Sequence, residues 1–412
     1  MNRSAKMPIN QKKCVNRQRN QWHARGGLPI LAGILGILLV FGCFQLAAAS
    51  EFALVERTCS KDSRGLSIAL ANIRNRVSDT KAGIEQAASV EENKARILKL
   101  VDMAKKAGAN MILIPEFSLT GYFWPDPDWD KSLGPYNPKG YTECWAYMNK
   151  GALNHHKDWL KVLKSRLDDQ LQYIIFNALR RNPADPSRPA GPENKFLNST
   201  YVVDKQFNCE NLSENEKDRI YDKTMLPGIE NVYEFSGQDD VLVVETPWGR
   251  FGFTTCYDMC FSQLYETYAG INRVDGVIEL ASWRGPALRA YPMMNIRNEQ
   301  YYGYQWNLMA AARAATNQIW ILACNSVGAQ KVGAYNFWGG SGLWAPSGIP
   351  LFQASNKNEQ LCVIHQVNIR QEVAAEDDDF DFYDSFRKIY HPILKKRAFT
   401  RMEENTSSNH VR

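Results

Sequence analysis

The sequence predicts an α/β protein, and two observations carry that prediction. Short apolar runs typical of buried strands alternate, along residues 66–367, with longer stretches in which apolar residues recur at helical spacing. The composition is that of a globular protein, because 44% of the 412 residues are hydrophobic and 23% are charged. This excludes a wholly disordered chain, a collagen-like chain and a multi-span membrane protein. The length allows two or three average domains, or one large α/β domain with extensions.

The apolar runs predict the strands and the amphipathic stretches predict the helices. Strands are expected at residues 66–73, 111–115, 172–179, 200–204, 241–245, 251–255, 276–281, 319–324 and 362–367. Helices are expected at residues 90–107, 157–169 and 300–316. In the first of these helices the apolar side chains from Ile97 to Ala107 lie at helical spacing, and Gly108 follows as a stop signal.

The N-terminus has the pattern of an export signal or a membrane anchor. Residues 28–49 carry no charge and follow a segment with seven basic residues and no acidic one. As a helix, a stretch of this length just reaches across a hydrocarbon core of roughly 30 Å, and the small residues at 47–50 suit a signal peptidase. We therefore expect an extracytoplasmic protein, secreted or membrane-anchored, with cleavage of the segment left open. The expected division is residues 1–50, a main domain over residues 51–370 and a charged C-terminal extension over residues 371–412.

The net charge gives no support for nucleic-acid binding. The chain has 49 basic and 44 acidic residues, and seven of the basic ones lie in the N-terminal tail. The rest of the chain is therefore close to neutral, without the basic surplus that binding to a phosphate backbone requires.

The cysteines fit an exported protein loosely. Of the nine, Cys14 and Cys43 belong to the tail, and the others are Cys59, Cys144, Cys209, Cys256, Cys260, Cys324 and Cys362. If one of these seven is a working thiol, the other six allow up to three disulfides. Their spacing does not match a zinc site, so no metal is expected. Sequons at Asn198, Asn211 and Asn405 matter only if the host glycosylates.

Three strand ends carry residues suited to acyl transfer. Glu116 follows the apolar run in MILIPEFSLTGY, Lys223 and Glu230 lie in YDKTMLPGIE, and Cys256 ends the run in RFGFTTCYDMCF. Reactive side chains of open α/β sheets gather where strands end. A carboxylate can take the thiol proton and return it to a departing amine, and an ammonium can stabilise the oxyanion.

Each residue also has a structural interpretation. A single cysteine at a strand end is most often a small core residue. Glu116 could cap the turn that follows it, and Lys223 could be an ordinary surface charge. The residues by themselves leave these alternatives open.

Six segments in order resemble the carbon–nitrogen hydrolase family, also called the nitrilase superfamily, and its Glu–Lys–Cys triad. They are PEFSLTGY around Glu116, the segment with Lys223, GFTTCYDMCF around Cys256, GVIELASW ending at Trp283, LMAAARAATNQIWILACNSVG and GGSGLWAPSGIPL. Together they span about residues 66–370. The stretch TPWGRFGFTTCYD is similar to the family's exported branch of pantetheine and biotin-amide hydrolases, so the chain resembles an exported or membrane-anchored amidase-like member.

The resemblance implies a four-layer α-β-β-α sandwich that forms a homodimer or higher homo-oligomer. It implies hydrolysis of an amide or carbamoyl carbon–nitrogen bond through a cysteine thioester, without a metal or cofactor. Cys256 would be the nucleophile and Glu116 the base, and Lys223 with the N–H after Cys256 would hold the oxyanion. Glu230 is the expected second acid and Glu234 the competing one. The expected substrate-binding residues are Tyr122, Tyr257 and Trp283.

Several alternatives remain at this point. Within the family, Tyr257-Asp258 after the nucleophile favours an amide over a nitrile, but nitrile hydrolysis by the same triad stays open. A catalytically inactive binding protein with the same fold is the alternative from another class. A papain-like protease and a serine hydrolase are disfavoured, since neither signature is present. A disulfide between Cys256 and Cys260 would silence the enzyme, and the substrate is not identified.

Overall fold

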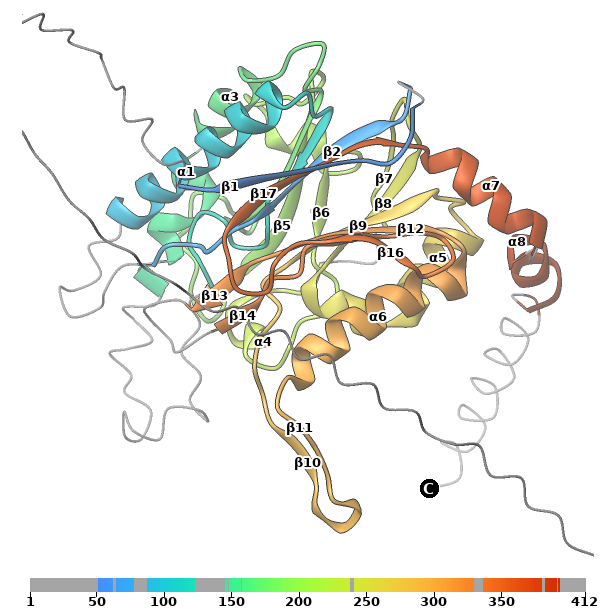
Figure 1. Ribbon diagram of the computed structural model, residues 1–412. Coiled ribbons are helices and arrows are strands. Elements are labelled where there is room, and N and C mark those ends of the chain that lie inside the picture. Colours follow the sequence, from blue (N-terminus) through green and yellow to red (C-terminus); the bar gives the residue numbers. More distant parts are fainter. Residues whose placement is uncertain are drawn as a thin grey trace, which may run out of the picture. The chain divides into compact units, whose positions relative to one another are not determined.

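The computed structural model describes residues 51–61, 64–77, 87–122, 145–146, 148–156, 158–237, 241–329, 336–379, 382–390 and 392. Every described residue belongs to the compact unit Ser50–Arg412. Two mixed β-sheets form the centre of this unit, and helices cover the outer side of each sheet (Figure 1). The predicted α-β-β-α sandwich is therefore confirmed, whereas the expected export segment lies outside the described residues.

The first sheet has seven strands in the order β1-β17-β2-β3-β4-β5-β6. Their bounds are β1 Ala53–Thr58, β17 Gln360–Val367, β2 Leu66–Asn72, β3 Met111–Leu113, β4 Tyr173–Arg181, β5 Phe196–Val203 and β6 Ile220–Asp222. Strands β2, β3 and β4 run parallel, which requires crossover connections between them. Helix α1 (Ala87–Lys106) lies in the first crossover and α3 (Asp158–Lys164) in the second.

The second sheet has six strands in the order β16-β15-β12-β9-β8-β7. Their bounds are β16 Pro350–Gln353, β15 Gly342–Trp344, β12 Trp320–Asn325, β9 Gly276–Ala281, β8 Arg250–Thr255 and β7 Val243–Glu245. Strands β8, β9 and β12 run parallel, and their crossovers contain α5 (Ser262–Gly270) and α6 (Tyr301–Asn317). These two helices contact each other on the outer side of the sheet.

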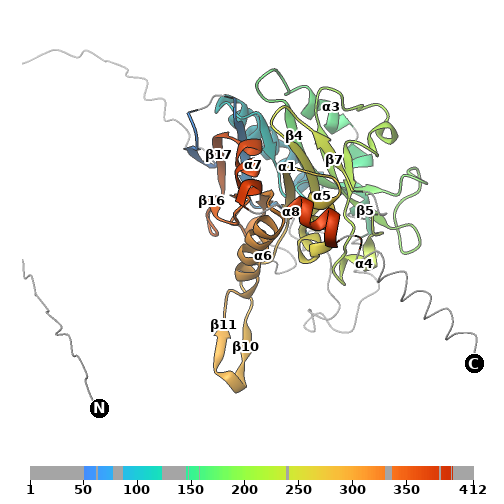
Figure 2. The same cartoon turned by 90° about the vertical axis from the view of Figure 1, so that its right-hand side faces the viewer.

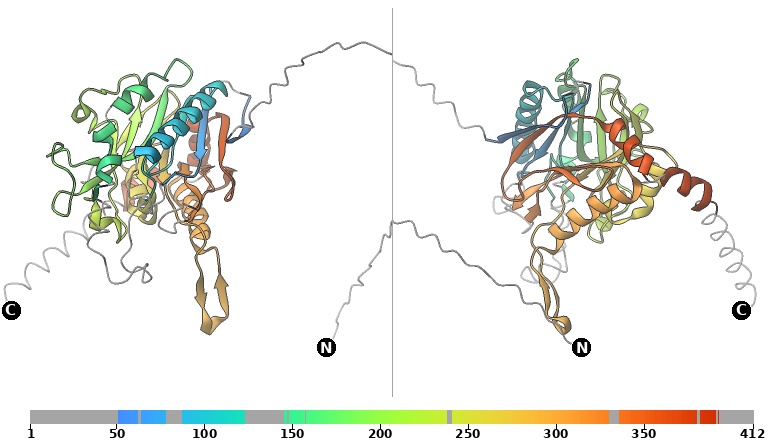
Figure 3. Two further views of the ribbon diagram at one scale, coloured as in Figure 1. Left: turned by 90° about the vertical axis from the view of Figure 1, so that its left-hand side faces the viewer. Right: turned by 45° about the vertical axis from the view of Figure 1, so that its right-hand side comes forward.

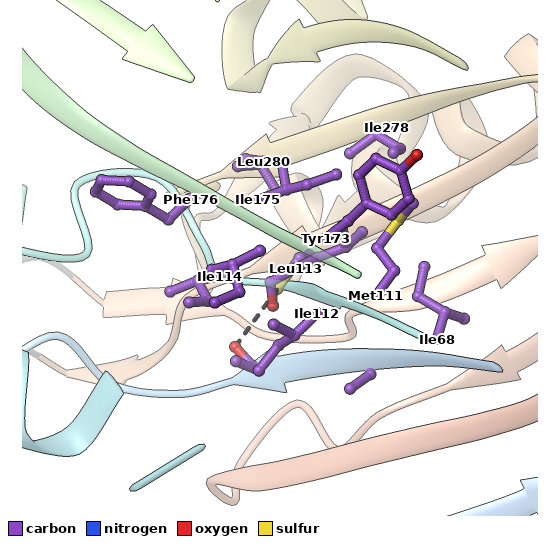
Figure 4. Packing of buried hydrophobic residues seen from close by; sticks show 14 of the residues in the cluster. Ile68, Met111, Ile112, Leu113, Ile114, Tyr173, Ile175, Phe176, Ile278 and Leu280 are labelled. Carbon is purple, nitrogen blue, oxygen red and sulfur yellow. Dashed lines mark hydrogen bonds between the residues drawn. The ribbon is translucent and has the colours of Figure 1, made fainter. Parts of the chain in front are cut away.

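The main core lies between the two sheets. Side chains of β4, among them Tyr173 and Ile175, lie against Ile278 and Leu280 of β9 (Figure 4). Ile175, Ile278 and Leu280 have no exposed surface, and burying such a side chain contributes about 1.5 to 3 kcal/mol. This packing fixes the sheets against each other, so that the ends of strands from both sheets can form one site.

Shorter elements complete the unit. They are α4 Glu230–Tyr233, β10 Arg289–Tyr291, β11 Ile296–Asn298, β13 Val327–Ala329, β14 Asn336–Trp338, α7 Ile369–Asp379, α8 Phe382–Asp384, the π-helix Ser385–Tyr390, and the 3-10 turns Leu153–His156, Leu212–Asn215, Cys256–Cys260 and Pro292–Met294. Strands β10 and β11 form a hairpin that projects from the rest of the unit (Figure 2, Figure 3). The charged extension expected from residue 371 begins within α7, most of which faces solvent.

Two predicted elements differ most in their limits from the structure. The helix expected at residues 157–169 ends at Lys164, because Asp168 accepts the backbone N–H groups of Gln170 and Leu171 and turns the chain. The strand expected at residues 200–204 begins earlier, at Phe196. Its first half contains the polar residues Asn198 and Ser199, of which Asn198 contacts the site described below. These two residues hide the strand from a search for apolar runs.

None of the disulfides that the sequence allows forms among the described cysteines. All six of these are free thiols, including Cys256 and Cys260; Cys144 is not among the described residues. Among the helices of the described residues, none is long and apolar enough to cross a membrane.

Candidate active site

The ends of strands from both sheets bring together the four residues predicted to act in catalysis. Glu116 follows β3, Lys223 follows β6, Cys256 follows β8, and Glu230 begins α4. The Lys223 ammonium lies 2.8 Å from Glu116 Oε1 and 2.7 Å from Glu230 Oε2. Lys223 is therefore not a surface charge, since it and both carboxylates are buried.

The Glu116 carboxylate is held from three sides. Besides the ion pair with Lys223, Oε1 accepts the side-chain amide of Asn198 at 2.9 Å, and Oε2 accepts the backbone N–H of Ser282 at 2.8 Å. Ser282 directly follows β9, so the second sheet helps to orient an acid of the first. Three donors fix the direction in which this carboxylate can take up a proton.

Asn198 is a site residue that the sequence reasoning missed. Its sequon marks a surface acceptor for a glycan, but its side chain is buried and also accepts the amide of Asn177. The folded chain therefore cannot carry a glycan at Asn198. The signal that could have found it is a short polar stretch directly before the apolar residues of β5.

Of the two candidates for the second acid, Glu230 is the one paired with Lys223. Its other oxygen, Oε1, accepts the hydroxyl of Tyr122 at 3.0 Å. Burial raises the pKa of Glu230 and the Lys223 ammonium opposes that rise. Glu234 is buried nearby, and burial together with the charge of Glu230 raises the pKa of Glu234 well above its ordinary value.

Lys223 stays cationic in this setting. Burial lowers the pKa of Lys223, but the charges of Glu116 and Glu230 outweigh it and raise the pKa well above its ordinary value. A fixed ammonium of this kind can stabilise negative charge that develops on a substrate oxygen.

Cys256 lies at the sharp turn where β8 ends. Its backbone φ is +53°, in the left-handed region that residues other than glycine rarely occupy. It begins the 3-10 turn Cys256–Cys260, where the side chain of Thr255 accepts the backbone N–H of Asp258 and the side chain of Asp258 accepts that of Thr255. The turn therefore presents the thiol in a defined direction.

Two further contacts hold this turn. The Asp258 carboxylate accepts the hydroxyl of Tyr221 at 2.7 Å and the backbone N–H of Met225 at 2.7 Å, which joins the turn to the segment that follows β6. From the outer side, the Arg313 guanidinium of α6 donates to the carbonyl oxygens of Met259 and Cys260, each at 3.1 Å. The Ala-Arg-Ala motif of the helix thus supports the backbone around Cys256.

The surroundings of the Cys256 sulfur favour the protonated thiol over the thiolate. Burial raises the pKa of the thiol well above the ordinary value, the charge of Glu116 raises it further, and Lys223 opposes the rise. Both groups are thus close enough to affect the sulfur. Since a thiolate is the reactive form, this cysteine needs a base at the moment of attack.

The three aromatic residues expected to bind substrate lie around these groups. Tyr122 contacts Glu230 through its hydroxyl. Trp283 packs in one buried cluster with Cys256, and its indole N–H donates to the carbonyl of Tyr302 at 2.8 Å. Tyr257 is half-buried and contacts the ring of Phe261 edge-on. Within the described ranges, no group of His, Cys, Asp and Glu is arranged to bind a metal ion.

Comparison with known proteins agrees with this geometry. The sequence profile of the Carbon-nitrogen hydrolase family matches residues 80–375. The chain belongs to the carbon–nitrogen hydrolase family. The match begins before α1 and ends within α7, so it includes every residue of the cluster described above.

Individual relatives are distant. A chloroplastic omega-amidase from Arabidopsis thaliana is 30% identical over 126 residues, which are 31% of this chain and 29% of that protein. An omega-amidase from Mus musculus is 28% identical over 275 residues, which are 66% of this chain and 81% of that protein. The amidase from Nesterenkonia sp. AN1 in complex with butyramide shares the fold at a TM-score of 0.51 and 18% identity, over 77% of this chain and 98% of that chain. The chain spans 29% and 57% of the length of the first two curated relatives that it matches.

Proposed function

We propose that this carbon–nitrogen hydrolase cleaves the carbon–nitrogen bond of a small carboxamide through a thioester on Cys256. The observation that carries the proposal is the buried Glu116–Lys223–Glu230 ion cluster beside a strand-end thiol. A buried ion pair adds little net stability, so hydrophobic residues at these positions would stabilise the fold equally well. Placed next to a nucleophile, it provides a base and a cation.

In the first half-reaction the thiol proton passes to Glu116 while sulfur attacks the amide carbon. The carbonyl oxygen becomes an oxyanion beside the Lys223 ammonium. The carbon–nitrogen bond then breaks, and Glu116 returns the proton to the departing nitrogen, so ammonia or an amine leaves and the acyl group remains as a thioester. Glu230 keeps Lys223 cationic and in place.

In the second half-reaction water replaces the amine. Glu116 takes a proton from the water as its oxygen attacks the thioester carbon, and Lys223 again lies beside the oxyanion. The carbon–sulfur bond breaks, the sulfur recovers the proton from Glu116, and a carboxylic acid leaves. The two half-reactions use the same groups, which explains why one buried cluster is sufficient.

An amide is favoured over a nitrile on two grounds. Several relatives are omega-amidases, and the amidase from Nesterenkonia sp. AN1 binds butyramide. In addition, Tyr257-Asp258 follows the nucleophile, and Asp258 is built into the turn through the Thr255, Tyr221 and Met225 contacts. Tyr122, Tyr257 and Trp283 would line the acyl pocket.

The test is intact-mass trapping of the acyl–enzyme from a mixed panel of amides and nitriles, together with measurement of ammonia release. The wild type should gain the mass of an acyl group from an amide, and Cys256→Ala should gain none and release no ammonia. Cys260→Ala is the matched control, because that thiol lies on the same turn and should be dispensable. Unchanged turnover by Cys256→Ala would refute the assignment, and turnover of nitriles alone would favour the alternative substrate class.

We also propose an extracytoplasmic location, with residues 28–49 as a cleaved signal or retained anchor, and a homo-oligomer. Support for the location comes from the uncharged segment and the basic residues before it. Cell fractionation followed by N-terminal sequencing checks the location and the cleavage, and light scattering of the purified protein checks the oligomeric state.

A further inference from the structure

The hairpin of β10 and β11 is the least integrated part of the described chain. It leads from the end of β9 to the start of α6 and projects away from both sheets (Figure 2, Figure 3). Its base is fixed by backbone hydrogen bonds from Gly285 to Asn336 and from Tyr301 to Ala287. Beyond the base each strand pairs over only three residues. A two-stranded ribbon of this size is marginally stable in water, so a partner that orders it would be favourable.

The tip of the hairpin is apolar and exposed. Met293 is 99% exposed, Met294 61%, Ile296 53% and Tyr291 44%. Asn295 adopts the left-handed backbone at φ +52° and closes the turn, which directs both methionines outward. An apolar group of this size held in water marks an interaction surface.

Basic side chains lie directly behind the tip. Arg289 and Arg297 flank the apolar residues, one on each strand. The Arg289 guanidinium lies 5.9 Å from the ring centre of Tyr291 and 5.4 Å from that of Tyr301. Arg297 lies 2.9 Å from Glu299, an exposed pair that contributes little. With a strand rise of about 3.3 Å per residue, the arginines lie roughly 5 to 10 Å behind the turn.

The polarity of the hairpin changes along its length and not between its faces. The pairs Tyr291 with Ile296 and Arg289 with Asn298 point to one side of the ribbon, and Arg297 opposite Ala290 points to the other. Each face therefore carries an arginine, and neither is a continuous apolar surface for packing flat on a protein. If the hairpin enters an apolar environment with its tip first, the two arginines remain at the boundary between that environment and water.

We propose that this tip inserts into the interfacial region of an anionic lipid bilayer. Apolar residues enter such a membrane by about 5 to 10 Å, which matches the distance from the turn to the arginines. At that depth Arg289 and Arg297 lie level with lipid phosphates, and the ring of Tyr291 lies at the boundary that aromatic residues favour. The inference does not depend on the proposed amidase activity.

A single tip of this size gives weak, reversible binding, and stable attachment takes a second signal. Residues 28–49 supply a candidate for that signal. The hairpin would then orient a chain that is already held near the membrane, with the ends of β8 and β9 at a set height above the lipid.

The test is hydrogen exchange of the full-length protein, read by mass spectrometry, with vesicles of phosphatidylcholine and phosphatidylserine. Exchange of residues 289–298 should slow at least several-fold on these vesicles and much less on phosphatidylcholine alone, while the segment around Ile349 stays unchanged. Met293→Asp combined with Met294→Asp should weaken vesicle partitioning about tenfold or more and remove the local protection. Arg289→Gln combined with Arg297→Gln should weaken it by a similar factor on the anionic vesicles alone.

The control is Ile349→Asp, which charges an equally exposed apolar residue outside the hairpin and should change neither readout. All variants are compared in the full chain, so any binding through residues 28–49 is common to them. Unchanged exchange at residues 289–298 on anionic vesicles would overturn the proposal. Protection that appears without vesicles and grows with protein concentration would overturn it too, and would assign the tip to a second copy of the chain.

Discussion

Both sheets bury carboxyl groups near Cys256, but the groups that contact these carboxyls differ. Glu116 and Glu230 each contact the Lys223 ammonium within hydrogen-bond distance. Glu279, on β9 behind the nucleophile, is as deeply buried, and its hydrogen bonds come from the hydroxyls of Thr254 and Tyr265. Burial raises the pKa of Glu279 well above its ordinary value. The buried carboxyl groups thus have two different settings, one beside a cation and the other beside neutral hydroxyls.

Replacing Lys223, the cation of the cluster, should have the largest combined effect on stability and activity. Lys223→Met leaves two carboxylates buried without a counter-ion, so we expect the free energy of unfolding to fall by about 3 to 5 kcal/mol. Because the oxyanion also loses its partner, kcat should fall by roughly 10²-fold or more. Urea unfolding and ammonia release measure the two effects. The control is Lys205→Met, which breaks an exposed ion pair with Asp169 and should cost about 1 kcal/mol or less. Equal effects of the two changes would contradict the assigned role of Lys223.

Removing the base should be at least as severe for activity and milder for stability. Glu116→Gln keeps the size of the side chain and an oxygen that can accept Asn198 or Ser282, but it cannot take the thiol proton. We expect kcat to fall by roughly 10²- to 10⁴-fold, with slow formation of the acyl–enzyme in a mass time course. Acylation at the wild-type rate would show that another group deprotonates Cys256.

Asp258 should set the acid limit of activity. Burial raises the pKa of Asp258 to about 6, and the Tyr221 hydroxyl opposes that rise. Below pH 6 the folded protein protonates this carboxyl group, which then loses part of its capacity to accept Thr255, Met225 and Tyr221. We expect kcat/KM to fall about tenfold per pH unit below that value.

One substitution checks this assignment. Tyr221→Phe removes the hydroxyl that lowers the pKa of Asp258, so the acid limit should move to higher pH. Tyr268→Phe is the control, since that hydroxyl donates to the carbonyl of Phe253 instead. If the acid limit of activity has the same pH in Tyr221→Phe as in the wild type, a group other than Asp258 sets that limit.

The same comparison shows what the sequence could and could not predict. Glu116, Lys223 and Cys256 follow strand ends, and Glu230 lies in the same segment as Lys223. The order of these residues resembles a family, so sequence alone was enough to nominate them. Asn198 and Ser282 were missed because their role is to orient Glu116. The order of the strands in the first sheet brings Asn198 to Glu116, and the stacking of the second sheet on the first brings Ser282 to it. Glu279 was missed because it stands within the apolar run of β9, where it resembles an interruption of a core strand.

The fold shows the same limit. Apolar runs predict the central strands well, since burial on both faces leaves a continuous signal. The hairpin of β10 and β11 has three-residue strands without alternation and was not predicted. The sequence contains little periodic pattern for contacts between distant segments. The same holds for elements that project from the rest of the unit.

Glu279→Gln should have the smallest effect on activity, and it tests the carboxyl group whose neighbours are hydroxyls. The glutamine oxygen can accept the Thr254 and Tyr265 hydroxyls, so we expect kcat within a few-fold of wild type.

The pH dependence of the stability of Glu279→Gln should differ from that of the wild type, however. Because the pKa of Glu279 is raised in the folded state, the unfolded chain releases this proton first. Wild-type stability therefore falls relative to the variant, by up to about 1.4 kcal/mol per pH unit, as the pH rises above about 4.5 towards the folded-state pKa. Urea unfolding of both proteins across this range should show the glutamine variant gaining relative stability with pH. Parallel curves would mean that Glu279 is ionised in the fold, and that hydroxyls alone can hold a buried carboxylate beside the nucleophile.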